Sequence, residues 1–372
     1  MEQPKGKNNN IVLTGGHAAT TAVAVVQEIN SAGLNWKLYW IGVKNAIEGK
    51  KVMTLESEVL PRLGVKFLPL TTGRLQRRFT LWTIPSMLKI PIGIFQAFFY
   101  LIKIKPSAVL SFGGFASFPV VINAKLLGIP VVIHEQTSAA GRSNLLSAKF
   151  ASMIALSRKE SVKYYPSNKC KLTGNPVIKE ITKVKSKSKI GNPPVIFITC
   201  GSRGSQKING VLEVILKKLL SKYALIHQTG GLDYLKFSDI KQKLPQALRN
   251  NYEVFVRVNP LEISNIYQKC DIVIARAGAN TVSEIMTVKR PAILIPLSIS
   301  FMNEQMKNAK IAGDWGVAKI IPQEILTPEI LFKNIENLID NYSIIVEKIK
   351  NKESPDIGAS KKLLSILRGY VK

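Results

Sequence analysis

The 372-residue sequence is short of acidic side chains, with 24 Asp and Glu against 52 Lys and Arg and a formal net charge of +28. Such an excess predicts an anionic partner: nucleic acid, acidic lipid or a phosphate-rich substrate. The basic residues are scattered and form no recognised nucleic-acid-binding motif, so we expect no nucleic acid among the partners. A general lysine bias of the source proteome would also explain part of the excess.

Cysteine and histidine are scarce, with three residues of each. Cys170, Cys200 and Cys270 lie far apart and lack the spacing of a metal site, which is typical of a reduced, cytosolic protein. The first ten residues are polar and contain no apolar signal-peptide core. We therefore expect a globular intracellular protein, long enough for two domains.

Short β-branched runs alternate with longer helical stretches along the chain, which predicts parallel, doubly wound sheets. The expected strands of the first half are Asn10–Leu13, Lys37–Ile41, Val65–Pro69, Ala108–Phe112, Pro130–His134 and Met153–Leu156. Those of the second half are Val195–Thr199, Ala224–His227, Glu253–Val256, Asp271–Ala275 and Ala292–Pro296. The sequence therefore predicts an α/β protein with two Rossmann-like domains.

A polar segment with five lysines in Lys179–Lys189, followed by Gly191-Asn192-Pro193-Pro194, separates the two sets of strands. We expect an N-terminal domain over residues 1–178, a linker over 179–194, a C-terminal domain over 195–350 and a closing helix over 351–372. Ligands are expected in a cleft at the carboxyl ends of the strands.

The segment Arg74–Lys105 has six basic residues and no acidic one, with many aromatic and aliphatic residues between them. Its longest uncharged run, Ile90 to Ile102, is too short to cross a bilayer, which needs about 20 residues. We expect Arg74–Leu88 to be a peripheral membrane anchor, the alternative being a core helix with snorkelling lysines. Ile92–Ile102 is expected to lie in the core. The expected membrane contacts are Arg74, Arg77, Arg78, Phe79, Leu81 and Trp82.

Small-residue or polar loops follow the predicted strands, where backbone N–H groups and helix dipoles favour anions. They are Thr14-Gly15-Gly16-His17, Phe112-Gly113-Gly114, His134-Glu135-Gln136-Thr137, Cys200–Ser205 and Arg276–Glu284, with Asn303-Glu304-Gln305 beginning a later helix. Glu284, expected in a first helical turn, could accept hydrogen bonds from a sugar diol or simply complement the helix dipole. His17 could act as a general base or only cap or pack, and we expect His134 and Glu135 to brace loops.

The order and spacing of these motifs closely resemble the MurG family of GT-B glycosyltransferases, within glycosyltransferase family 28. The likeness covers nearly the whole chain and includes Gly128-Ile129-Pro130, Gly174-Asn175-Pro176-Val177 and His227-Gln228-Thr229-Gly230. The family moves N-acetylglucosamine (GlcNAc) from UDP-GlcNAc onto undecaprenyl-pyrophosphoryl-N-acetylmuramyl-pentapeptide (lipid I), giving lipid II for peptidoglycan. The resemblance implies an inverting enzyme at the cytoplasmic face of the plasma membrane, without a metal or another cofactor.

The resemblance also implies residue roles. His17 and Glu284 would be catalytic, with Glu284 on the ribose hydroxyls. The implied donor-binding residues are Thr14, Gly15, Gly16, Thr137, Ser202, Pro260, Ala279, Asn280, Thr281, Val282, Ser283, Glu284 and Gln305. The implied acceptor-binding residues are Gly113, Gly114, His134, Glu135 and Gln136, with Gly15 and Gly16 on the acceptor's pyrophosphate side.

The chain departs from the family pattern at several positions. Thr137 stands where Asn is usual, Ile178 where Arg is usual, Arg203 where Gln is usual, and Glu304 precedes Gln305. These changes leave the fold and the donor class intact but put the sugar and the acceptor in question. The alternatives are another lipid acceptor such as diacylglycerol, a non-catalytic nucleotide-sugar-binding protein, and a basic nucleic-acid-binding protein.

Overall fold

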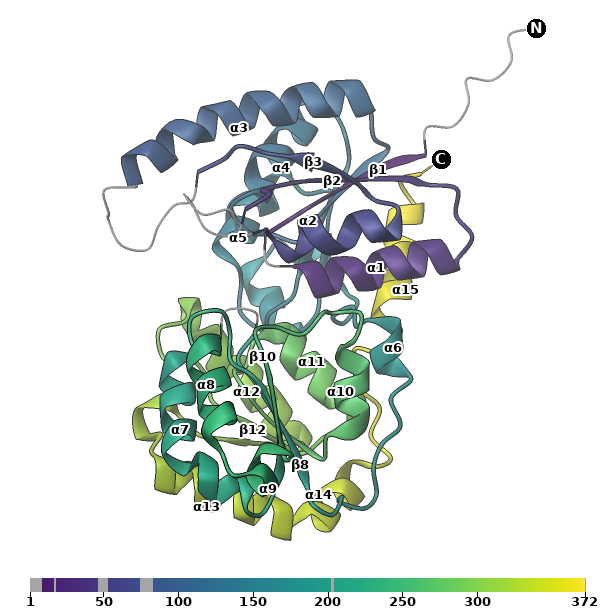
Figure 1. The fold of residues 1–372 in the computed structure, drawn as a ribbon. Helices are drawn as coiled ribbons and strands as arrows, with labels where there is room; N and C mark the ends of the chain where they lie inside the picture. The colour runs from purple at the N-terminus through teal and green to yellow at the C-terminus, as the bar shows by residue number, and fades with distance from the viewer. Residues whose placement is uncertain (1–8, 17, 46–52, 74–82, 202–203, 372) are drawn as a thin grey trace, which may run out of the picture. The chain divides into compact units, whose positions relative to one another are not determined.

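The computed structural model describes residues 9–16, 18–45, 53–73, 83–201 and 204–371. The chain divides into two compact units (Figure 1). Unit 1 comprises Met1–Lys179 and Gly358–Lys372, and unit 2 comprises Glu180–Ile357. All strand pairs within the two sheets are parallel, which confirms the predicted doubly wound α/β class.

Within the described residues, unit 1 has a sheet of seven strands in the order β3-β2-β1-β4-β5-β6-β7. The strands are β1 (Asn10–Thr14), β2 (Lys37–Gly42), β3 (Lys66–Pro69), β4 (Ala108–Ser111), β5 (Val131–Glu135), β6 (Met153–Leu156) and β7 (Cys170–Leu172). The central strands β1 and β4 are almost entirely buried, as expected for a parallel sheet covered on both faces.

The helices of unit 1 lie between its strands in sequence, apart from the carboxyl-terminal helix α15. They are α1 (Ala19–Ser31), α2 (Leu55–Val59), α3 (Thr83–Ile104), α4 (Ser117–Leu126), α5 (Arg142–Ser147) and α15 (Ala359–Arg368), with short 3₁₀ turns η1 (Leu60–Leu63), η2 (Ala148–Phe150), η3 (Lys159–Tyr164) and η4 (Ser167–Lys169). The carboxyl-terminal helix α15 packs against α1 (Figure 1). It buries Leu363, Leu364 and Leu367, so the end of the chain completes the core of unit 1.

The described part of unit 2 has a sheet of six strands in the order β10-β9-β8-β11-β12-β13. The strands are β8 (Val195–Thr199), β9 (Ala224–Gln228), β10 (Tyr252–Phe255), β11 (Ile272–Ala275), β12 (Ala292–Leu294) and β13 (Ala318–Ile320). The helices are α6 (Lys179–Thr182), α7 (Gln206–Leu220), α8 (Tyr234–Lys243), α9 (Gln246–Arg249), α10 (Ile263–Lys269), α11 (Ala279–Val288), α12 (Glu304–Trp315), α13 (Pro328–Asp340) and α14 (Tyr342–Ile349), with 3₁₀ turns η5 (Phe301–Asn303) and η6 (Gln323–Ile325).

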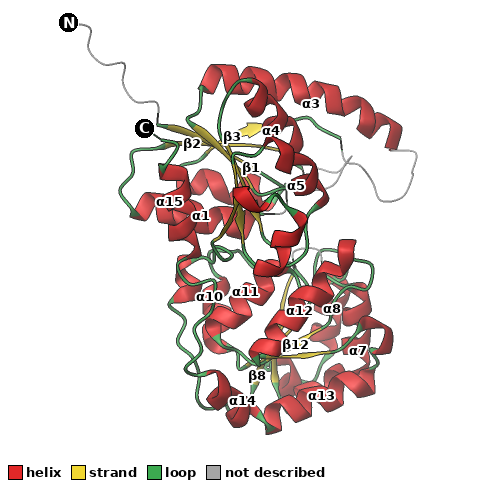
Figure 2. Cartoon of the chain, turned by 180° about the vertical axis from the view of Figure 1, so that it is seen from behind, coloured by secondary structure: helices red, strands yellow, loops and turns green. Residues whose placement is uncertain are grey.

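The two faces of the unit 2 sheet have different coverings. Ile196 and Ile198 of β8 belong to a core shared with α7, α8 and α13, which lie together in Figure 2. Phe197, between them in sequence, faces the other way and packs edge-on against Tyr267 of α10. This alternation places α10 and α11 on the opposite face from α7 and α8.

Two short strands were missing from the prediction, and both lie at sheet edges. β7 and β13 are three residues long, and β7 has exposed residues at Lys171 and Leu172. Strands this short, half solvated, carry no β-branched run that would distinguish them from loops. The helix α3 corrects a further expectation. Although Ala97 and Leu101 of α3 are buried, Phe95 and Phe99 are each 65% exposed, so the prediction of a core position was wrong for one face of Ile92–Ile102.

Among the described residues, no helix is both long and apolar enough to cross a membrane.

Candidate active site

The two glycine loops of unit 1 touch each other at the carboxyl ends of β1 and β4. The Gly16 amide donates to the Gly113 carbonyl at 2.9 Å. A Cβ on Gly114, whose φ is +87°, would lie 2.8 Å from the Gly16 nitrogen. Any side chain at Gly114 would therefore separate the loops. The Thr14 hydroxyl is buried and donates to the Ile41 carbonyl at 2.8 Å, so this side chain stabilises the sheet.

Several predicted site residues lie outside the residues that the structure describes. They are His17, Ser202 and the expected membrane contacts Arg74, Arg77, Arg78, Phe79, Leu81 and Trp82.

A carboxylate of the chain itself occupies the amino end of α1. The Ala18 amide donates to Glu56 Oε1 at 2.9 Å, and Glu56 is only 5% exposed. A negative charge is favoured at this position by the helix dipole and the free N–H groups. The sequence prediction missed Glu56, because it lies 38 residues away in the chain with no local signal.

Glu135, at the end of β5, holds together the loop that leads to α5. Its Oε2 accepts from the Gly141 amide (2.9 Å), Asn144 Nδ2 (3.0 Å) and the Tyr165 hydroxyl (2.5 Å). Its Oε1 accepts from the amide (3.1 Å) and the hydroxyl (3.2 Å) of Thr137. With five donors on two buried oxygens, this carboxylate braces the loop.

The other polar residues of this loop also serve the fold. His134 is fully buried, and its Nε2 lies 3.2 Å from the Gly174 carbonyl and 3.3 Å from Ser157 Oγ. The Thr137 hydroxyl, besides donating to Glu135, accepts from the Ala139 amide at 3.1 Å. Gln136 and Thr137 are half-buried, whereas His134 and Glu135 are buried. Gln136 and Thr137 are therefore the more accessible residues of this loop.

In unit 2, the loop after β8 rests on the loop after β9. A Cβ on Gly204, φ +72°, would overlap the Thr229 carbonyl oxygen at 1.9 Å, so only glycine fits. Asn209 Nδ2 fixes that carbonyl at 2.9 Å and also donates to Asp233 Oδ2 at 2.6 Å. Its Oδ1 therefore faces His227 Nε2 (3.1 Å), which must carry the proton. Burial lowers the pKa of His227 to about 4, so the ring stays neutral.

Helix α11 begins after an N-cap residue that has no side chain. Gly278 is its N-cap residue, and it offers no side-chain acceptor to the first turn. Ala279, Asn280 and Thr281 are partly accessible, whereas the side chains of Val282 and Ser283 are buried. This end of α11 has the geometry of an anion site formed by backbone N–H groups.

Glu284 is the sixth residue of α11, so the expectation of a first-turn position was wrong: it lies in the second turn. It is 9% exposed, and the Tyr267 hydroxyl donates to its Oε2 at 2.9 Å. Burial raises the pKa of Glu284 to about 7, and the hydrogen bond from Tyr267 opposes this rise. Within the described part of the chain, Oε1 of Glu284 accepts no hydrogen bond, in contrast to Glu135.

Arg276 links three loops around the carboxyl end of β11. It donates to the Ile295 carbonyl (3.1 Å), to Ser205 Oγ (2.7 Å) and to Gln323 Oε1 (2.6 Å). Ser205 is in turn the N-cap of α7, where its hydroxyl accepts from the Ile208 amide. The sequence analysis assigned Arg276 no role, since three partners so distant in sequence leave no local pattern.

Gln305 takes part in closing the loop before α12. Its Oε1 accepts from the Leu297 amide at 2.9 Å, and its own amide donates to Ser300 Oγ at 3.3 Å. Met302 and Asn303 both have positive φ, 53° and 54°, a costly conformation for residues with a side chain. Pro260, one of the implied donor-binding residues, is buried in the segment before α10.

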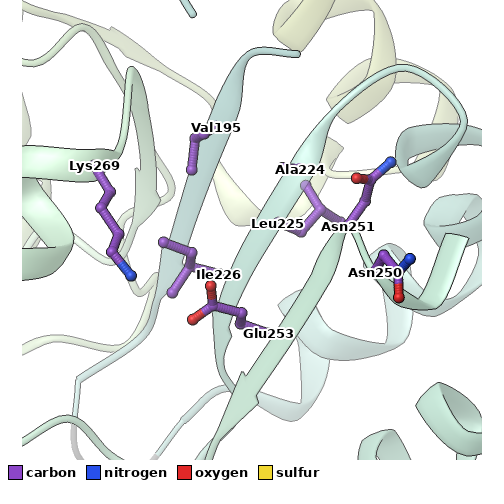
Figure 3. A pocket seen from close by; sticks show the side chains of 8 residues that line it. All are labelled: Val195, Ala224, Leu225, Ile226, Asn250, Asn251, Glu253 and Lys269. Atoms are coloured by element: carbon purple, nitrogen blue, oxygen red, sulfur yellow. The ribbon is translucent and has the colours of Figure 1, made fainter. Parts of the chain in front are cut away.

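A pocket of 330 Å³ lies at the amino ends of β8, β9 and β10, and Figure 3 shows the side chains that line it. It is lined by Val195, Ala224, Leu225, Ile226, Asn250, Asn251, Glu253 and Lys269. None of these is a predicted site residue. The predicted residues follow the carboxyl ends of the strands, where parallel α/β sheets bind their ligands.

Comparison with known proteins matches both halves of the chain to one family. Residues 13–156 match the glycosyltransferase family 28 N-terminal domain, and residues 195–363 match the family's C-terminal domain. The crystal structure of Acinetobacter baumannii MurG superposes with a TM-score of 0.68 at 24% identity, covering 97% of this chain and 99% of that one.

Two curated relatives are UDP-N-acetylglucosamine–N-acetylmuramyl-(pentapeptide) pyrophosphoryl-undecaprenol N-acetylglucosamine transferases. The one from Clostridium botulinum is 32% identical over 97% of this chain and 99% of its own length. One from Bacillus cereus is 32% identical over 92% of this chain and 96% of its own. Two doubly wound units that match the two domains of glycosyltransferase family 28 define a GT-B glycosyltransferase. The chain belongs to glycosyltransferase family 28, in its MurG branch, which confirms the resemblance seen in the sequence.

Proposed function

We propose that the chain transfers GlcNAc from UDP-GlcNAc to lipid I, forming lipid II. The donor half of this proposal is carried by α11, which begins after a glycine N-cap and carries a buried carboxylate in its second turn. Among the described residues, one oxygen of that carboxylate accepts no hydrogen bond. The sugar and the acceptor come from the relatives, which are named for this reaction and align over nearly the whole chain.

The donor would bind to unit 2 by backbone and carboxylate contacts. The first-turn amides of Ala279, Asn280 and Thr281 would hold the diphosphate at the amino end of α11, assisted by Ser202. The Val282 amide already donates to the Gly278 carbonyl at 3.0 Å. Glu284 would accept from the ribose hydroxyls, and the backbone near Pro260 would contact the uracil. Gln305 would donate from Nε2 to the GlcNAc hydroxyls, since its Oε1 already binds the Leu297 amide.

The chemical step is a direct displacement at the anomeric carbon. The acceptor hydroxyl attacks as UDP leaves from the opposite face, so the configuration inverts. His17 would take the proton of the attacking hydroxyl. Negative charge develops on the leaving diphosphate, where the α11 amides would stabilise it.

The acceptor pyrophosphate would bind at the paired glycine loops of unit 1, Gly15–Gly16 and Gly113–Gly114. The Gly16 amide donates to the Gly113 carbonyl, and Gly16 and Gly114 are the two partly accessible glycines of the four, so they would meet the pyrophosphate. His134 and Glu135 would act on the acceptor indirectly by fixing the adjacent loop, and Gln136 and Thr137 are more accessible than either.

We further propose that unit 1 binds an anionic membrane peripherally, at the cytoplasmic face of the plasma membrane. Helix α3 exposes Ile92, Phe95, Phe99 and Ile102, which recur every three or four residues and so share one face. The exposed Lys103 lies beside this face. Aromatic and aliphatic groups beside a cation suit the interface of acidic lipids. The proposal includes the basic segment from Arg74 to Trp82.

Vesicle sedimentation tests the membrane contact. We expect binding to phosphatidylglycerol vesicles that weakens when Phe95→Ser and Phe99→Ser are combined. The matched control is Leu235→Ser, which changes a side chain that is 79% exposed in unit 2. Equal binding of the double variant and the wild type would exclude α3 as the membrane surface.

Radiolabelled UDP-GlcNAc and a short-chain lipid I analogue test the reaction, with His17→Ala and Glu284→Gln beside the wild type. We expect transfer by the wild type, its loss in His17→Ala, and a KM for the donor raised roughly tenfold or more in Glu284→Gln. Donor binding without transfer would overturn the lipid II assignment. Transfer to diacylglycerol would then identify another lipid acceptor, and no transfer to either would leave a binding protein.

A further inference from the structure

Tyr267 is held at three points in unit 2. Its ring is fully buried in α10 and packs edge-on against Phe197 of β8, with ring centroids 5.8 Å apart and planes at 90°. Its carbonyl accepts from Arg290 Nε at 3.2 Å, and the Arg290 guanidinium is itself completely buried. Its hydroxyl, the third point, donates to Glu284 Oε2 at 2.9 Å.

This hydroxyl can only donate to its partner. Burial, together with the charge of Glu284, raises the pKa of Tyr267 well above its ordinary value, so the proton stays on the phenol. A donor at Oε2 favours the ionised form of Glu284 and opposes the effect of burial, which raises the pKa of that carboxyl to about 7. It also leaves Oε1 as the oxygen for a ligand, in an orientation fixed by the buried ring.

We propose that Tyr267 is a positioning residue for the donor's ribose: its hydroxyl orients Glu284 and favours its charged form, so that the carboxylate can accept from the ribose diol. The inference rests on the proposed donor site and goes beyond it, since Tyr267 itself touches no substrate. A carboxyl free to rotate would present a misaligned oxygen to the diol, and a protonated one would present an O–H donor. In either case recognition of the ribose would weaken.

The test is calorimetric binding of UDP and of 2′,3′-dideoxy-UDP to the wild type and to Tyr267→Phe. We expect the Kd for UDP to rise about fivefold to tenfold in the variant, the cost of one lost hydrogen bond to a charged group. The Kd for the dideoxy nucleotide should stay unchanged, because that ligand offers no diol to Glu284. An unfolded variant would bind neither nucleotide, so the dideoxy ligand also reports folding.

The pH dependence supplies a readout that a purely structural role would not move. The preference for UDP over the dideoxy nucleotide should grow as Glu284 ionises, and in Tyr267→Phe this rise should shift to higher pH. The matched control is Tyr342→Phe, which removes another buried hydroxyl of unit 2, one that donates to the Lys187 carbonyl at 3.3 Å. We expect this control to bind both nucleotides as the wild type does.

Equal UDP binding by Tyr267→Phe and the wild type, or an equal loss for both nucleotides in a folded variant, would overturn the inference. A wild type that binds UDP with a clear diol preference but transfers no GlcNAc would overturn the proposed reaction alone. A wild type that binds neither nucleotide would overturn both.

Discussion

Each unit holds a buried glutamate that accepts from a tyrosine hydroxyl, yet the two carboxylates differ in what remains to be bound. Glu135 in unit 1 has five donors from Thr137, Gly141, Asn144 and Tyr165. Glu284 in unit 2 has one, from Tyr267, among the described residues. A saturated carboxylate has no capacity for a ligand and determines a loop. An unsaturated one carries a desolvation cost that a ligand can relieve, which is typical of a binding site.

The amino ends of two helices repeat this contrast. Glu56 places a carboxylate from the chain itself at the amino end of α1, whereas the N-cap residue of α11, Gly278, has no side chain to offer. Both ends attract anions for the same reason, the free N–H groups and the helix dipole. The difference indicates that the amino end of α1 already holds a carboxylate of the chain, while Glu284 and the amino end of α11 keep capacity for an external partner.

The largest effect is expected when the saturated carboxylate becomes an amide. Glu135→Gln turns one of two acceptor oxygens into a donor that faces other donors, leaving at least one buried N–H group without a partner. We expect a loss of about 4 kcal/mol in unfolding free energy. Thermal unfolding should show a midpoint lower by roughly 8 to 16 °C.

Unchanged stability of Glu135→Gln would show that the five hydrogen bonds do not brace the loop. A donor KM altered in the folded protein would contradict the separation of roles between the two glutamates.

Replacing Glu284, the unsaturated carboxylate, should stabilise the protein near neutral pH, whereas replacing Glu135 destabilises it. The pKa of Glu284 rises from 4.5 to about 7 on folding, so between these pH values the folded state keeps a proton that the unfolded state releases. The stability contribution is therefore present below pH 4.5 and lost as the pH rises through 7, by about 3 kcal/mol. Glu284→Gln removes this loss.

Urea unfolding at several pH values measures the difference between Glu284→Gln and the wild type. This difference should grow from pH 4.5 to pH 7 in favour of the variant and then stay constant. His227, whose pKa is lowered to about 4, gives a dependence of the opposite sign between pH 4 and 6.5, but it is common to both proteins and cancels. A difference that does not change with pH would contradict the raised pKa that burial gives Glu284.

The sequence was sufficient to predict the features that depend on local pattern. Alternating apolar runs predicted the central strands, with Met153–Leu156 and Val195–Thr199 matching their observed bounds. It also predicted the turns in which Gly114 and Gly204 are required by close backbone contact.

What the sequence did not reveal depends on contacts between distant residues. Glu56 at the end of α1, and Tyr165 and Tyr267 on their glutamates, are brought to their partners only by the tertiary fold. The exposed face of α3 was missed for a related reason. Composition shows that a helix is apolar, but it does not determine which faces of the helix neighbouring elements cover in the fold.

Tyr165→Phe is the unit 1 counterpart of Tyr267→Phe. It should change stability alone, and by less than Glu135→Gln does. Four donors would remain on Glu135, so we expect a loss of about 1.5 kcal/mol. UDP binding should match that of the wild type, because Glu135 belongs to the fold of unit 1. Thermal unfolding and calorimetry on both variants give the comparison. A weakened UDP affinity in Tyr165→Phe would show that the two tyrosine–glutamate pairs do not have separate roles.

The smallest effect is expected from Glu56→Gln, at the amino end of α1. Glu56→Gln keeps an acceptor for the Ala18 amide and loses only the charge, so the unfolding free energy should fall by about 0.5 to 1 kcal/mol. Glu56→Ala loses the hydrogen bond as well and should fall by about 2 kcal/mol. Chemical denaturation resolves this series, and equal stability of the alanine variant and the wild type would contradict the capping role. UDP is proposed to bind at the amino end of α11 and not of α1. The same concentration of UDP should therefore raise the unfolding midpoints of the wild type and of Glu56→Ala by the same increment.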